Sequence, residues 1–181
     1  VLSDQVQVYM VIERNVNLHE AGRIVRFGLD HPAVRGINFQ PAFHAGRHDA
    51  KFVLHTHSLN GVAVSTQRAG LLPISQHSIF VLASLGYHDF EGPALNDEEK
   101  PRLVRDLGDT NSLILRNHGL LTVGQEVADA WVRMYYLESS CAIQVRAQAG
   151  GGELISISKE VMDAGYAAAN TEQQRRGERG E

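Results

Sequence analysis

Two histidines separated by one residue, His55 and His57, are the side chains of this 181-residue chain best suited to chemistry. In an extended strand, residues i and i+2 point to the same face, so two imidazoles at this spacing can bind one ion. A third histidine, His118, stands between Asn117 and Gly119 further along the chain. Three protein ligands with one open position are typical of catalytic zinc. The spacing predicts a metal centre; the alternatives are a surface pair and a turn histidine bonded to nearby backbone.

The elements expected to position these histidines are short apolar strands. Residues 52–55 form an apolar run that predicts a buried strand ending at the pair. Residues 112–116 and 120–123 predict two strands on either side of His118. Since sites in α/β proteins form at the ends of core strands, both groups of histidines stand where a site is expected.

Other segments predict the surrounding frame. Apolar positions recur near a period of 3.6 from residue 127 to residue 145, which indicates a long helix ending at the glycines 150–152. Residues 29–41 contain two prolines and no clean period, so we expect a loop there, and residues 87–93 predict a turn. Ser158 is expected to cap a final helix.

Composition restricts the class of protein. A net charge of -4 gives no reason to expect a nucleic-acid partner or an anionic membrane surface. The apolar stretches are too short to span a bilayer, and the first residues do not resemble a signal peptide. The single cysteine, Cys141, suits a reducing compartment, so we expect a cytoplasmic protein. Residues 1–170 are expected to form one domain and residues 171–181 a disordered charged tail.

Several motifs resemble the class II aldolase/adducin family. They are the runs 55–58 (HTHS), 61–65 (GVAVS), 70–77 (GLLPISQH), 87–92 (YHDFEG), 115–124 (LRNHGLLTVG) and 135–138 (YYLE). The resemblance implies a three-layer α/β/α fold around a mostly antiparallel sheet. It also implies zinc bound by His55, His57 and His118, and a tetramer with sites at subunit interfaces.

The chain departs from the family's aldolases at the acid–base positions. The resemblance places the aldolase glutamate near position 36, where this chain has Gly36, and the catalytic tyrosine within 76–78, where it offers His77. The resemblance also implies that the N-terminal part of the family domain is short or missing in the given sequence. The likeness is therefore strongest to the adducin-like branch.

Two residues are candidates for the missing proton-transfer groups. His77 can act as acid or base near neutral pH, and the alternative is a structural histidine. Glu91 can take the place of the base, and the alternative is a carboxylate that stabilises a turn. His44 and His48 either lie on the surface or line the mouth of the site.

The resemblance and the histidines together predict a divalent-metal-binding, aldolase-like lyase that acts on a small hydroxy-carbonyl or sugar-derived substrate. Zinc is the expected metal, with manganese or iron as alternatives, because imidazole ligands suit several divalent metals. Two other functions are compatible with the sequence. One is a non-enzymatic, adducin-like interaction module, and the other is an iron-dependent oxygenase or decarboxylase on the same three histidines.

Overall fold

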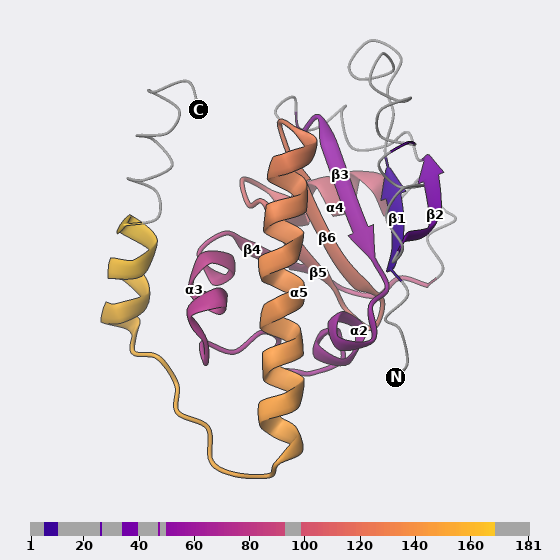
Figure 1. Cartoon of the computed structure of the whole chain (residues 1–181). Coiled ribbons are helices and arrows are strands. Elements are labelled where there is room, and N and C mark those ends of the chain that lie inside the picture. The colour runs from indigo at the N-terminus through magenta and orange to yellow at the C-terminus, as the bar shows by residue number, and fades with distance from the viewer. Residues whose placement is uncertain are drawn as a thin grey trace.

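A mixed β-sheet forms the centre of the molecule (Figure 1). The computed structural model describes residues 6–10, 26, 34–39, 47, 50–92 and 99–168. Within this part of the chain the sheet has six strands in the order β2-β1-β3-β6-β5-β4. Their bounds are β1 Val6–Met10, β2 Val34–Phe39, β3 Phe52–Thr56, β4 Leu85–His88, β5 Ser112–Leu115 and β6 Gly119–Gly124.

The expectation of a mostly antiparallel sheet is wrong. Strands β1 and β2 pair in parallel, as do β4 and β5, whereas β3 pairs antiparallel with both β1 and β6, and β5 pairs antiparallel with β6. The β4–β5 pair is parallel because helix α4 (Lys100–Leu107) connects the two strands, and a crossover through a helix returns the chain in the same direction. The sheet is therefore mixed.

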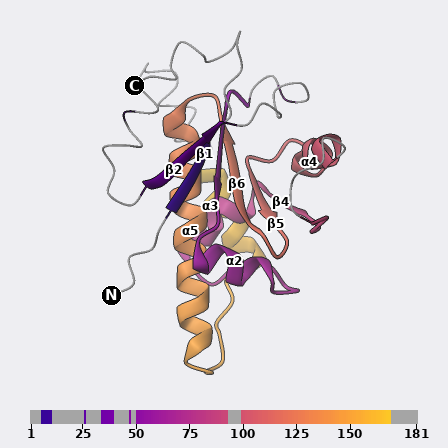
Figure 2. The same cartoon turned by 90° about the vertical axis from the view of Figure 1, so that its right-hand side faces the viewer.

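Helices cover the two faces of the sheet unequally (Figure 2). Helix α5 (Val127–Ala149) packs on β3, β5 and β6, and helices α2 (Leu59–Ser65) and α3 (Gln76–Leu82) pack against α5. Helix α4 lies on the opposite face and contacts β4 and β5. Among the described helices α4 alone covers that face, so a complete three-layer arrangement stays a prediction.

The alternation of side chains along the central strands builds one apolar core on each face. Leu54, Ile114 and Leu120 pack with α5, in a cluster that includes the buried Leu137. On the other face, Val53, Leu113, Leu115, Leu121 and Val123 pack with Leu107 of α4. All six residues of β6 are buried, since both of its faces are covered.

Two segments differ from the sequence predictions. Residues 29–41 were expected to be a loop, but the chain forms β2 there, and Gly36 lies inside this strand. A glycine within the strand and prolines on either side removed the periodic signal of an edge strand. Residues 87 and 88 were expected in a turn but belong to β4.

The two helices expected after residue 126 are both present. The long helix begins at Val127, next to its N-cap Glu126, and ends at Ala149 before Gly150. Residues 159–168 form the final helix, and Ser158 accepts a hydrogen bond from the backbone N–H of Val161, as expected of a cap. The charged tail, 171–181, lies outside the described residues, as do His44 and His48.

Candidate metal centre

The three histidines singled out by spacing come together in space. His55 lies at the end of β3, His57 follows the strand, and His118 lies in the turn between β5 and β6. One ligand-capable atom from each lies within 4.8 Å of the others. The ring centroids are 4.6 Å apart for His55 and His57, 4.9 Å for His55 and His118, and 4.7 Å for His57 and His118.

The backbone fixes the tautomer of His55. Its Nδ1 lies 2.7 Å from the carbonyl oxygen of Leu120, a group that can only accept, so Nδ1 carries the proton and donates. The neutral ring then presents the lone pair of Nε2, which lies 2.8 Å from Nε2 of His57. A histidine whose second nitrogen donates to a backbone carbonyl has the arrangement commonly seen in metal-ligating histidines.

A glycine allows the third histidine to approach the pair. Gly119 begins β6 beside β3, and a Cβ at this position would clash with the carbonyl oxygen of Thr56. The same Cβ would lie 3.2 Å from Cδ2 of His57 and 3.3 Å from Cε1 of His55. Asn117, just before His118, has a φ of 57°, in the left-handed region that asparagine tolerates better than most residues. The sequence Asn-His-Gly therefore suits a sharp turn beside the pair.

Burial favours the neutral form of the three imidazoles. It lowers the pKa of His55 to about 3, an effect that the hydrogen bond to Leu120 partly opposes and that His118 and His57 reinforce. Burial also lowers the pKa of His57. The pKa of His118 is lowered by burial first and then by the neighbouring His57 and His88. Neutral imidazole is the form that binds a metal, so this environment favours ligation.

The donor set fits a divalent metal. Three neutral imidazoles are a ligand set that zinc accepts with one position left open, and imidazole also suits iron. Nε2 of His55 lies 2.8 Å from Nε2 of His57, so these two nitrogens are close enough to serve as ligands of one ion. The described part of the chain contains no other group of this kind.

The histidines lie on the face of the sheet that α4 covers. His55 pairs across the ladder with Leu121, which packs in the cluster containing Leu107 of α4. Thr56, the next residue, points the other way and reaches α5. The site is therefore on the face that, among the described helices, only α4 covers. Phe90, an exposed residue, brings its ring to 6.3 Å from His118.

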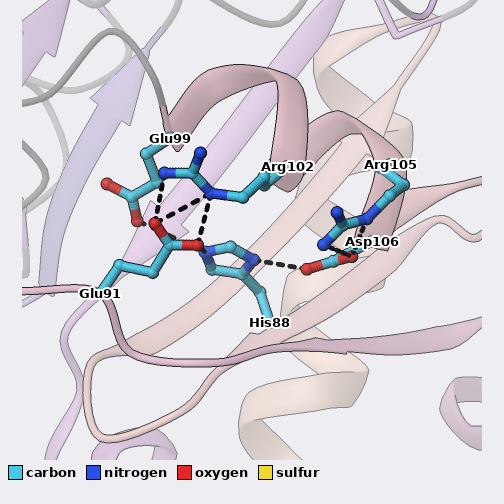
Figure 3. Close-up of polar contacts among 6 residues, drawn as sticks. All are labelled: His88, Glu91, Glu99, Arg102, Arg105 and Asp106. Carbon is cyan, nitrogen blue, oxygen red and sulfur yellow. Dashed lines mark hydrogen bonds and ion pairs between the residues drawn. The ribbon is translucent and has the colours of Figure 1, made fainter.

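A second polar cluster lies on this face around His88, the last residue of β4 (Figure 3). Nδ1 of the buried His88 lies 2.7 Å from a carboxylate oxygen of Asp106 on α4. Its Nε2 faces carboxylate oxygens of Glu99, at 3.4 Å, and of Glu91, at 3.9 Å. Within the described residues, Nε2 forms no hydrogen bond. Of this cluster, the sequence pointed only to Glu91. The signal available for the other members was the charged spacing of residues 99, 102 and 106 along one helix face.

Glu91 lies in this cluster and has a strong partner. Both of its carboxylate oxygens accept hydrogen bonds from Arg102, at 2.7 Å and 2.9 Å from Nε. The hydrogen bond from Arg102 lowers the pKa of Glu91. A base with a lowered pKa and two occupied oxygens is poorly suited to accept a proton. This geometry agrees better with the alternative of a stabilising carboxylate, and a catalytic role of Glu91 stays a prediction.

His77 lies on the other side of the sheet. It is part of α3, which packs against α5, and its ring centroid is 5.6 Å from that of Tyr136 on α5. Because α5 covers the face opposite the three histidines, the sheet separates His77 from the three histidines of the same chain. A proton-transfer role for His77 also stays a prediction.

Comparison with known proteins shows the family of this chain. Residues 14–145 match the family model described as the Class II Aldolase and Adducin N-terminal domain. The chain belongs to the class II aldolase and adducin family. The family resemblance predicted from the motifs is thereby confirmed.

Relatives of this class II aldolase/adducin chain include both branches. A Pseudomonas aeruginosa protein, named provisionally as an aldolase class 2 protein, is 54% identical over 127 residues, which cover 70% of this chain and 49% of the relative. Rat alpha-adducin is 42% identical over 118 residues, which cover 65% of this chain and 16% of the relative. The chain thus spans about half the length of the bacterial relative.

Solved structures of the family share the fold. An aldolase II superfamily protein from Pseudomonas syringae is 50% identical with a TM-score of 0.67, covering 70% of this chain and 51% of that one. An L-fuculose 1-phosphate aldolase from Glaciozyma antarctica is 25% identical with a TM-score of 0.60, covering 70% and 47%. Among the described helices of this family member, none is both long and apolar enough to cross a membrane.

Proposed function

We propose that this chain is the metal-binding domain of a class II aldolase-like lyase acting on a small hydroxy-carbonyl or sugar-derived substrate. The observation that carries the proposal is the convergence of His55, His57 and His118, with Nε2 of His55 held free of a proton by the Leu120 carbonyl. The aldolase named among the structural neighbours acts on L-fuculose 1-phosphate, which makes sugar phosphates the first class to test.

The three histidines would hold a divalent metal, with zinc expected first and manganese or iron as alternatives. Bound there, the metal would act as a Lewis acid on the oxygens of a hydroxy-carbonyl substrate. The protein's own contribution is to keep the imidazoles neutral by burial and to fix their directions. Phe90, beside His118, is placed to limit the access of water and to contact the apolar part of a substrate.

Proton transfer requires groups beyond these histidines. Gly36 stands where the resemblance places the aldolase base, and Arg102 occupies both oxygens of Glu91. We propose that His77 transfers a proton at the site of a neighbouring copy, because the three histidines of its own chain lie across the sheet. This assignment needs the homo-oligomer, a tetramer, that the family resemblance implies. We further propose one family domain through residue 170, in a cytoplasmic protein.

The second candidate is an adducin-like interaction module without turnover. It is supported by the 42% identity to alpha-adducin and by the glycine at the position of the base. In that case the histidines would bind a metal, or stay metal-free, without a chemical step.

An assay of substrate turnover distinguishes the lyase from the interaction module and from the oxygenase. The zinc-loaded chain, and the longer protein that contains it, would be offered L-fuculose 1-phosphate and related hydroxy-carbonyl compounds, and the released aldehyde would be measured. We expect zinc-dependent cleavage that His57→Ala abolishes. Metal binding without cleavage of any compound would refute the lyase and favour the interaction module. Oxygen consumption by the iron-loaded protein would instead favour the oxygenase.

A further inference from the structure

A carboxylate on α5 contacts both neighbours of His57 in the chain. Glu138 is half-buried on the sheet-facing side of α5. Its Oε1 accepts a hydrogen bond from the hydroxyl of Thr56 and its Oε2 accepts one from the hydroxyl of Ser58, each at 2.5 Å. Thr56 and Ser58 are both buried. Hydrogen bonds to an ionised acceptor are among the stronger ones in proteins, so this contact joins α5 firmly to the end of β3.

His57, like His118, lies just outside the strands that flank it. Strand β3 ends at Thr56, whose ladder partner is Leu120, so His57 is the first residue beyond the strand. His57 is also the most exposed of the three histidines. With Thr56 and Ser58 both held from the α5 side, the backbone of His57 is fixed on each side and its ring is directed to the α4 face.

Ser58 links this contact to the start of α2. Its hydroxyl accepts a hydrogen bond from the backbone N–H of Gly61 at 2.9 Å, as the N-cap of that helix, while it donates to Glu138. A hydroxyl has one proton to donate and lone pairs to accept, so the carboxylate sets the orientation that the cap needs. The chain therefore turns from strand to helix at one defined place, directly after the histidine pair.

We propose that Glu138 is a positioning residue of the metal centre, which acts through Thr56 and Ser58 to fix the direction of the His57 imidazole. Glu138 lies across the sheet from the metal ligands and does not itself bind the metal. The inference rests on the proposed metal binding at His55, His57 and His118. It extends that proposal by assigning part of the site's geometry to a helix on the opposite face.

The test compares Co²⁺ and Zn²⁺ binding to variants of the whole chain. Glu138→Ala removes both acceptors, and Glu138→Gln keeps the size but leaves one hydroxyl without its acceptor. Thr56→Val removes one hydroxyl at nearly constant volume, whereas Thr56→Ser restores it. Glu153→Gln, an exposed glutamate beyond α5, controls for the lost charge. Circular dichroism and melting temperature show whether each variant is folded.

We expect Glu138→Ala to weaken Zn²⁺ binding by about 10- to 100-fold, as is typical when a residue supporting a ligand is lost. Glu138→Gln and Thr56→Val should weaken it less, and Thr56→Ser and Glu153→Gln should match the wild type. The visible absorption of bound Co²⁺ should change in the weakened variants, since it reports ligand geometry. In the metal-free protein, NMR of the histidine ring nitrogens should show an altered His57 signal in Glu138→Gln.

Two results are distinguishable. If the wild type binds Co²⁺ and Glu138→Gln and Thr56→Val bind it with the same affinity and the same spectrum, the positioning role is refuted while the metal site stands. If the wild type itself binds neither metal, the proposed metal centre fails. The NMR comparison then decides whether Glu138 still orients His57.

Discussion

The carbonyl oxygen of Leu120 lies 2.7 Å from Nδ1 of His55, so a backbone group of β6 determines which nitrogen of a β3 histidine carries the proton. Leu120 is fully buried and is the ladder partner of Thr56, so this carbonyl cannot easily move. The pairing of β3 with β6 thus both brings His118 near the pair and prepares His55 to bind through Nε2. The register between β3 and β6 therefore determines which nitrogen of His55 can bind a metal.

Gly119 should tolerate no side chain. We expect Gly119→Ala to lower the free energy of unfolding by about 1–3 kcal/mol, because the added Cβ would meet the Thr56 carbonyl. Since Cβ would also press on both histidine rings, metal affinity should fall with stability. Urea denaturation measures the first effect. Gly152→Ala, where a Cβ meets nothing within 4 Å, is the control and should change neither quantity. A Gly119→Ala protein with wild-type stability would show that the strand β6 can shift at no cost.

Asp106 should contribute stability that acid removes. Burial raises its pKa, but the hydrogen bonds from His88 and Arg105 outweigh burial, and the pKa lies below its ordinary value. A carboxyl with a lowered folded-state pKa stabilises the fold above its unfolded pKa of about 3.9, and this contribution is lost as pH falls through the folded pKa. Asp106→Asn keeps an acceptor but loses the charge, so we expect a loss of about 1 kcal/mol at pH 7.

The pH dependence provides the check on Asp106. Denaturation curves of wild type and Asp106→Asn, measured from pH 7 to pH 3, should converge as the pH falls below about 4. A difference that stays constant over this range would mean that the charge of Asp106 does not stabilise the fold through His88 and Arg105.

The frame of the site was largely predictable from the sequence, because it depends on local pattern. The apolar run before His55 predicts β3, and the 3.6 period predicts α5 from Val127. The partnership of Glu138 with Thr56 and Ser58 joins residues about 80 positions apart, and no local pattern contains it. The same holds for His88 and Asp106, which meet only because β4 and α4 pack together. Strand β2 was not predicted, because Gly36 weakens the strand pattern and the strand forms by pairing with β1.

Mutations can decide whether Glu91 serves the ion pair with Arg102 or acts as a general base. If Glu91 serves the ion pair with Arg102, then Glu91→Gln and Arg102→Gln should lower thermal stability slightly and to the same extent, because exposed ion pairs contribute little. Their effects on any lyase turnover should also match. A loss of about 10²- to 10⁴-fold in Glu91→Gln alone, with Arg102→Gln near wild type, would instead assign Glu91 the role of the base.

Metal content is the most direct test of the central claim that His55, His57 and His118 form one metal centre. The purified protein would be stripped with a chelator, dialysed against Zn²⁺ and analysed for zinc per chain. We predict about one zinc per chain for the wild type, as for a three-histidine site with an open position, and the same for the control His77→Ala. His118→Ala should lose the bound zinc while circular dichroism shows a retained fold. A wild type that stays free of zinc, or a His118→Ala protein that keeps its zinc, would contradict the account.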